Sequence, residues 1–87
     1  MGKSIYSAEQ VVLQEILKGY RGDAKLSQVE LSTLLGKPQS FVSKYESGQR
    51  RLDLVELQSI CRCLGVSLGS LVKRFEKRCK DLNSGSN

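Results

Sequence analysis

The feature that most constrains the fold is a helical apolar period that recurs in short segments, each followed by a glycine. Apolar residues spaced three and four apart lie on one face of an α-helix, and Gly36, Gly48 and Gly65 stand where such segments end. Glycine readily adopts the left-handed backbone that terminates a helix. The alternating pattern of a half-buried strand is absent from the sequence. We therefore expect an all-α chain with five helices, at 8–20, 27–35, 38–47, 53–64 and 67–82.

The expected helix starts carry capping residues. A serine followed three residues later by glutamate or glutamine forms a capping box, and an aspartate in the first position gives the acidic version of the same arrangement. The sequence offers these signals at Ser7 with Gln10, at Ser27 with Glu30, at Asp53 with Glu56, and at Ser67.

Length, charge and cysteine content limit the classes of protein to which the chain can belong. The chain has 87 residues, enough for one domain, and its net charge of +5 is compatible with nucleic acid or another anionic surface. No apolar run approaches the roughly 18 residues of a membrane span, and residues 1–6 lack the apolar core of a signal peptide. Three cysteines, an odd number, fit a reducing compartment. We expect a cytoplasmic protein that does not bind membranes.

Nothing in the sequence predicts an enzyme, a metal site or a cofactor. The chain has no histidine, no nucleophile–base set and no glycine loop of the kind that cradles phosphates. Three cysteines without histidine do not make a usual closed zinc site, and Cys61 and Cys63 are two residues apart, so they point in different directions on a helix. We also expect no small-molecule substrate.

The segments on either side of Gly36 form a recognisable motif. A short turn containing glycine between two short helices is the helix-turn-helix arrangement, and Leu35, Gly36 and Lys37 form that turn. Ser32 is small, which lets the second helix cross closely above the first. Residues 26–72 resemble the phage-repressor/Cro-like (Xre-type) helix-turn-helix family, through LSQVELS at 26–32, LG at 35–36, QSFVSKYESG at 39–48, RRLD at 50–53 and LGVSL at 64–68.

The resemblance implies a five-helix, repressor-type bundle with an extended last helix. It implies one DNA-binding domain at 7–82 with a C-terminal dimerisation helix, and we expect an N-terminal arm at 1–6 and a disordered tail at 83–87. The implied function is sequence-specific binding of double-stranded DNA by a small transcriptional regulator of the prokaryotic or phage repressor type, associated with the nucleoid. Helix 38–47 would enter the major groove.

The resemblance also implies which residues contact DNA. Base edges are read by amide, hydroxyl and basic side chains, and the base-reading positions are Gln39, Ser40, Ser43 and Lys44. Phosphates are expected to contact Gln28 at the start of the second helix and the flanking residues Lys25, Lys37, Gln49, Arg50 and Arg51.

Four further positions have other roles. The family pairs the positions of Arg21 and Glu46 as a partly buried ion pair that ties the first helix to the third. Phe41 either packs over the seam between the second and third helices, which we favour, or touches a thymine methyl group. Pro38 stands where the family commonly has serine or threonine, and it fits a first helical turn because its missing N–H would be unpaired there. Any DNA contact of that hydroxyl is lost in this chain.

The last expected helix carries an apolar stripe longer than one domain needs. We expect its first part to close the core, through Leu68, Leu71 and Val72, and its second part to form a dimer interface, through Phe75, Cys79 and Leu82. An uncovered apolar stripe indicates a partner, and a second copy related by a two-fold axis is the simplest one. Such a homodimer would bind a pseudo-palindromic operator. The alternatives are an antitoxin of the same fold that binds a toxin protein as well as DNA, and a protein-interaction adaptor.

Overall fold

The computed structural model describes residues 7–85, and these form five α-helices and no strand. The helices are α1 (Ala8–Asp23), α2 (Gln28–Leu34), α3 (Ser40–Glu46), α4 (Leu54–Leu64) and α5 (Leu68–Gly85). The predicted all-α class is therefore confirmed. The expected arm at 1–6 and the last two residues of the expected tail lie outside the described residues.

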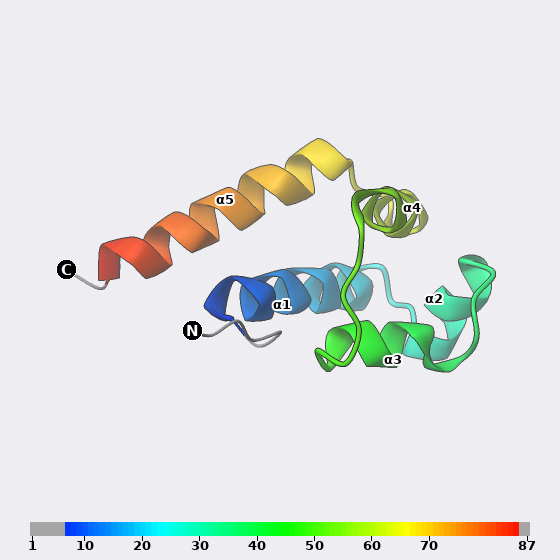
Figure 1. Cartoon of the computed structure of the whole chain (residues 1–87). Helices are drawn as coiled ribbons and strands as arrows, with labels where there is room; N and C mark the ends of the chain where they lie inside the picture. The colour runs from blue at the N-terminus through cyan, green and yellow to red at the C-terminus, as the bar shows by residue number, and fades with distance from the viewer. Residues whose placement is uncertain (1–6, 86–87) are drawn as a thin grey trace.

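Helix α1 occupies the middle of the molecule, with α5 along one side of it and α3 along the other (Figure 1). Helices α2 and α3 pack together, and α4 packs against the beginning of α5 (Figure 1). Residues from every helix meet in one core, whose largest fully buried members are Tyr45, Leu17, Leu31, Ile60 and Leu71. The short connections leave each helix next to its sequence neighbour, as expected for a small bundle.

Most predicted caps are present. Ser27 with Glu30 and Asp53 with Glu56 each form both halves of a capping box. The hydroxyls of Ser7 and Ser67 each accept one backbone N–H, from Gln10 and from Ser70. Because these side chains satisfy backbone donors that a helix start leaves unpaired, they fix where the helices begin.

Three helix boundaries differ by two or more residues from the expected ones. Helix α1 ends at Asp23, three residues later than predicted. Helix α3 begins at Ser40, two residues later than predicted, and Pro38 lies before the helix, not in its first turn. The carbonyl of Pro38 accepts from the N–H of Phe41 at 2.9 Å. This hydrogen bond joins residues three apart and forms a turn before the helix. Helix α5 continues to Gly85, so residues 83–85 of the expected disordered tail are helical.

Positive backbone φ angles mark the turns between helices. Gly36, Gly48 and Gly65 have φ of 69°, 87° and 76°, the left-handed conformation that favours glycine. Lys25 adopts the same conformation with φ of 58° in the turn between α1 and α2. Lysine is not a typical residue for that position, so this turn could not be recognised from its residue type.

Phe41 packs in the core and is 6% exposed, so the favoured packing interpretation is confirmed. Its ring meets that of Tyr45 edge to face, with the ring centroids 5.5 Å apart. Val72 was expected in the core, and that prediction is wrong: its side chain is 41% exposed, whereas Leu71 beside it is buried.

In the part of the chain that the structure describes, no single helix is long and apolar enough to cross a membrane. Helices α4 and α5 meet that criterion only as a pair, and they are bent by 108° with respect to each other.

Candidate nucleic-acid interface

Helix α3 is capped by a side chain from another helix. Its own N-cap residue, Gln39, forms no side-chain cap. Instead, the Ser32 hydroxyl on α2 accepts from the N–H of Val42 at 3.2 Å and donates to the Gln39 carbonyl at 3.3 Å. Ser32 is completely buried, so no water replaces these bonds. The hydroxyl therefore fixes α3 on α2. From the sequence, Ser32 was expected only to be small enough for the two helices to cross closely.

The other end of α3 is held by the carboxylate of Glu46. This group accepts from Arg21 Nε at 2.7 Å, from Arg21 Nη2 at 3.0 Å and from Gln28 Nε2 at 2.9 Å. Arg21 Nη1 donates to the carbonyl of Leu26, and Gln14 Nε2 donates to the backbone carbonyl of Glu46. The Glu46 side chain is 4% exposed and that of Arg21 is 15% exposed. Helix α3 is thus tied to α1 and to the start of α2.

The charge of Arg21 is stabilised by this arrangement. Hydrogen bonding to Glu46 raises the pKa of the Arg21 guanidinium above its ordinary value, and this effect outweighs the cost of desolvation. Gln28, which was predicted to contact phosphate, donates a hydrogen bond from its side-chain amide to the Glu46 carboxylate in this structure. The sequence did not predict this internal role.

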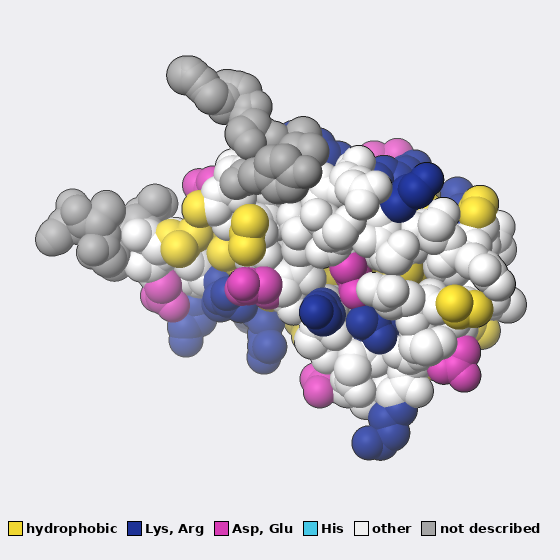
Figure 2. All heavy atoms as spheres, turned by 90° about the horizontal axis from the view of Figure 1, so that it is seen from below, with side chains coloured by type: hydrophobic (Ala, Val, Ile, Leu, Met, Phe, Trp, Pro, Cys, Tyr) yellow, Lys and Arg dark blue, Asp and Glu magenta, His cyan; other side chains and the backbone are white. Residues whose placement is uncertain are grey.

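The outward side of α3 carries short polar groups and one lysine. Gln39, Ser40 and Lys44 are exposed, and Ser43 is half-buried with its hydroxyl donating to the Ser40 carbonyl at 3.1 Å. Figure 2 shows the molecule from the side on which α3 lies: uncharged polar side chains and backbone dominate its middle, and hydrophobic side chains gather toward its two ends. Three of the four predicted base-reading residues therefore lie on one short helix whose opposite side is buried, and the fourth, Gln39, is its N-cap residue.

The predicted phosphate-binding residues differ in exposure and in their place relative to α3. Lys25, Lys37, Gln49 and Arg51 are exposed, and Lys37 and Gln49 lie just before and just after α3. The backbone N–H groups of Gln49 and Arg50 both donate to the carbonyl of Lys44, at 2.9 and 3.2 Å. The loop that leaves α3 is therefore folded back onto the end of the helix.

Arg50 also forms hydrogen bonds to other residues of the protein. Its Nη2 donates to Glu56 Oε2 at 2.7 Å, and its Nη1 donates to Glu56 Oε1 at 3.1 Å and to the Arg51 carbonyl at 2.9 Å. The guanidinium carbon lies 4.9 Å from the centroid of the Phe41 ring, within the range of a cation–π interaction. The hydrogen bond from Arg50 lowers the pKa of the Glu56 carboxyl, and the backbone N–H of Asp53 adds to this effect.

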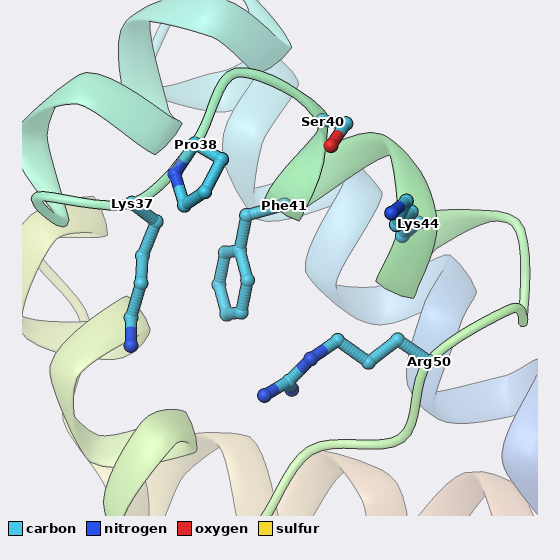
Figure 3. Close-up of a pocket in the computed structure, with 6 residues that line it drawn as sticks. All are labelled: Lys37, Pro38, Ser40, Phe41, Lys44 and Arg50. Carbon is cyan, nitrogen blue, oxygen red and sulfur yellow. The ribbon is translucent and has the colours of Figure 1, made fainter.

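A notch of about 260 Å³ opens between α3 and this arginine. Its lining comes from the turn before α3, the outward side of α3 and the loop after it, through Lys37, Pro38, Ser40, Phe41, Lys44 and Arg50 (Figure 3). Figure 3 shows Lys37 and Arg50 extending past the Phe41 ring from different elements. The fold thus brings two predicted base-reading residues and two predicted phosphate-binding residues around one concave site.

The stripe on α5 is partly covered by the chain itself. Phe75 and Cys79 are half-buried and pack against the core, whereas Leu82 is 42% exposed. Burial also raises the pKa of the Cys79 thiol, which disfavours the reactive thiolate. An apolar groove of about 280 Å³ runs beside this stripe, lined by Leu13, Leu57, Leu71, Val72, Phe75 and Glu76. The expectation that nothing in the chain covers the stripe is therefore wrong for Phe75 and Cys79.

Comparisons with known proteins identify the class of fold. A helix-turn-helix family model matches residues 17–71, more than half of the chain. An XRE-family like protein from Pseudomonas syringae pv. tomato has a structure with a TM-score of 0.77 and 39% sequence identity, over 82% of this chain and 87% of that one. The chain belongs to the Xre-type helix-turn-helix family, and it is a DNA-binding protein of the transcriptional-regulator class.

Two more distant structures share the fold. A mutant of the restriction-modification controller protein C.Esp1396I gives a TM-score of 0.75 at 22% identity, over 84% of this chain and 92% of that one. The clp gene regulator ClgR from Corynebacterium glutamicum gives 0.77 at 19% identity, over 92% and 85%. No curated protein matches the sequence significantly.

Proposed function

We propose that this chain is a dimeric, sequence-specific transcriptional regulator that places α3 in the major groove of its operator. The observation that carries the proposal is the contrast between the two sides of α3. One side is fixed by the buried Ser32 hydroxyl and by the Glu46 network, and the other presents Gln39, Ser40 and Lys44 to solvent. A rigidly held helix with exposed amide, hydroxyl and ammonium groups is suited to base readout.

Each outward side chain has a chemical preference in the major groove. A glutamine amide pairs with the N6 and N7 edge of adenine, and a lysine ammonium donates to the O6 and N7 acceptors of guanine. Serine hydroxyls donate or accept, so Ser40 and Ser43 contact either a base or a nearby phosphate. Gln39 and Lys44 therefore carry most of the sequence preference.

The surrounding residues supply affinity that does not depend on sequence. Lys25, Lys37, Gln49 and Arg51 are exposed, so their positive charge and amide donors are available to phosphates. Gln28 and Arg50 complete the proposed phosphate-binding set, although both also bond within the protein. Because the amide of Gln28 is held on Glu46, its contact to phosphate requires either its backbone N–H or a rearranged side chain.

A homodimer is proposed to form through α5 and the apolar groove beside it. Val72 and Leu82 remain exposed on the stripe that also contains Phe75 and Cys79, and an apolar surface of this kind marks an interface. Two copies related by a two-fold axis would present two α3 helices to successive major grooves, about 34 Å apart. The operator would then be pseudo-palindromic.

The site is tested by selecting bound duplexes from a random pool with the wild-type protein and with three variants. Gln39→Ala and Lys44→Ala are expected to change the selected sequence at separate positions and to cost about 1–3 kcal/mol each at the base concerned. Lys77→Ala, an exposed lysine on α5, is the control for charge loss and leaves the selected sequence unchanged. Retention of the wild-type preference by both α3 variants would refute the assigned roles.

The dimer is tested separately by the mass of the protein in solution. Wild type is expected to be a dimer, and Val72→Asp together with Leu82→Asp is expected to give a folded monomer because a buried unpaired carboxylate is costly. Val29→Asp replaces a similarly exposed valine on α2 and keeps the dimer. A monomeric wild type at micromolar concentration would contradict the proposed interface.

A further inference from the structure

The guanidinium of Arg50 is held on one edge and open on another. A guanidinium has five N–H donors, and three of them are used: two on Nη1, to Glu56 and to the Arg51 carbonyl, and one on Nη2, to Glu56. No described residue accepts from Nε or from the second N–H of Nη2. These two N–H groups point in parallel from the same edge, the fork geometry that matches two oxygens of a carboxylate or phosphate.

The orientation of this fork is fixed by its neighbours. Glu56 holds the adjacent Nη1–Nη2 edge with bonds of 3.1 and 2.7 Å, and the Phe41 ring lies 4.9 Å from the guanidinium carbon. Phe41 itself is fixed in the core. The carboxylate of Glu56 is fixed in turn, because it also accepts the backbone N–H of Asp53 in the capping box of α4. The arginine is therefore preorganised before any ligand arrives.

The surroundings of Arg50 favour an anion. The notch beside it is lined by Lys37, Lys44 and the exposed Ser40, and Lys37 Nζ lies 5.4 Å from the centroid of the Phe41 ring. Three cationic side chains thus meet around one small concave site, with a hydroxyl at its rim. Two fork donors, the Lys37 ammonium and the Ser40 hydroxyl fit the several oxygens of one phosphate group, and the Lys44 ammonium remains available to a base.

We propose that this notch binds one phosphate group of the DNA backbone, with Nε and Nη2 of Arg50 as a bidentate clamp and Glu56 as the residue that positions it. The proposal rests on the proposed function, since it takes operator DNA as the source of the phosphate. It assigns to Glu56, an acid close to a DNA-binding surface, a contribution that strengthens DNA binding. Charge alone predicts the opposite, because removing an acid reduces repulsion of a polyanion.

The first experiment compares Arg50→Lys, Arg62→Lys and Glu56→Gln for affinity to the selected operator at constant salt. Arg50→Lys keeps the charge but loses the fork, and we expect roughly tenfold weaker binding, the scale of one charged hydrogen bond. Arg62→Lys makes the same replacement at an exposed arginine on α4, outside the proposed phosphate-binding set, and is expected to change affinity less than about threefold. Equal effects of the two replacements would overturn the bidentate clamp.

Glu56→Gln tests the positioning role. Glutamine at this place still completes the capping box of α4, so the helix is preserved, and thermal unfolding verifies it. We expect roughly threefold weaker binding, because glutamine accepts only one of the two Arg50 bonds. Tighter binding by Glu56→Gln would overturn the positioning role.

Two further arms identify the source of the phosphate. Neutral methylphosphonate is placed at single backbone positions of the operator, and one position per half-site is expected to weaken wild type but to weaken Arg50→Lys no further. If no position shows this coupling, the DNA contact is overturned. Inorganic phosphate is titrated against the free protein while the NMR signal of Arg50 Nε–H is followed.

The phosphate titration separates this proposal from the proposed function. If wild type binds no operator, the proposed function fails. In that case a saturable shift of the Nε–H signal that is confined to Arg50 identifies a site for free phosphate and overturns DNA as the source. No shift in a protein that also ignores DNA overturns the site itself.

Discussion

Breaking the ion pair between Arg21 and Glu46 should strongly destabilise the protein. Replacing Arg21 with methionine removes two of the three side-chain donors to Glu46 and leaves only the amide of Gln28. The carboxylate is 4% exposed, so water does not replace the lost donors. A buried charge left without its partner costs about 3–5 kcal/mol. Because Arg21 itself is 15% exposed, we expect the lower end, about 3 kcal/mol.

This loss is large for a chain of 87 residues. Domains of this size have a free energy of unfolding of about 4–13 kcal/mol, and 1 kcal/mol corresponds to about 4–8 °C in Tm. Arg21→Met is therefore expected to lower Tm by about 12–24 °C. It should also weaken DNA binding at temperatures where the protein is still folded, because Glu46 lies at the end of α3.

A double-mutant cycle in urea measures the pair directly. Glu46→Leu alone leaves the Arg21 charge without its partner, whereas Arg21→Met with Glu46→Leu removes both charges. The double variant should therefore lose about 1.5–3 kcal/mol less stability than the sum of the two single variants. The control is Arg78→Met, which breaks an ion pair to Glu15 whose side chains are 43% and 58% exposed and should cost less than about 1 kcal/mol. Additive losses in the first cycle, or equal losses for the two ion pairs, would refute the reasoning from burial.

Two further predictions concern residues that hold α3 and α4. Ser32→Ala removes the buried hydroxyl that accepts from the N–H of Val42, and it is expected to lower the free energy of unfolding in urea by about 1–3 kcal/mol. Thr33→Ala, on the exposed side of α2, should lower it by less than about 1 kcal/mol. Equal losses would exclude the cap that Ser32 provides to α3. Glu56 has a lowered pKa in the folded state, so its stabilisation is complete above its ordinary pKa of 4.5 and is lost as the pH falls below that value. Unfolding between pH 7 and pH 3 should therefore show a weaker acid dependence for Glu56→Gln than for wild type. Identical curves for the two proteins would contradict the prediction.

The helices themselves could be predicted from local rules. Capping pairs three residues apart and glycines after apolar segments act within one turn of the chain, so the starts of α2, α4 and α5 fell within one residue of their expected places. The start of α3 was misplaced because proline is compatible both with a first helical turn and with the turn that precedes a helix. At Pro38 the second arrangement is present.

The contacts between helices were less accessible to sequence reasoning. The Ser32 hydroxyl bonds to α3 only because of how α2 and α3 cross, and its spacing to Val42 follows no local rule. The Arg50 ion pair spans a loop between α3 and α4, so no helical spacing indicated Glu56 as its partner. The exposure of Val72 depends on the angle between α5 and the rest of the bundle. A periodic stripe indicates which face is apolar but not how much of it the fold covers.

Whether α3 reads bases is tested by one comparison of affinities. The selected duplex and a scrambled duplex of the same length and base composition are titrated with wild type at the same moderate salt concentration. We expect the selected duplex to bind at least about a thousandfold tighter, and we expect Gln39→Ala with Lys44→Ala to remove most of this difference. Equal affinity for the two duplexes, lost in parallel as salt rises, would show binding through phosphates alone and would exclude base reading by α3.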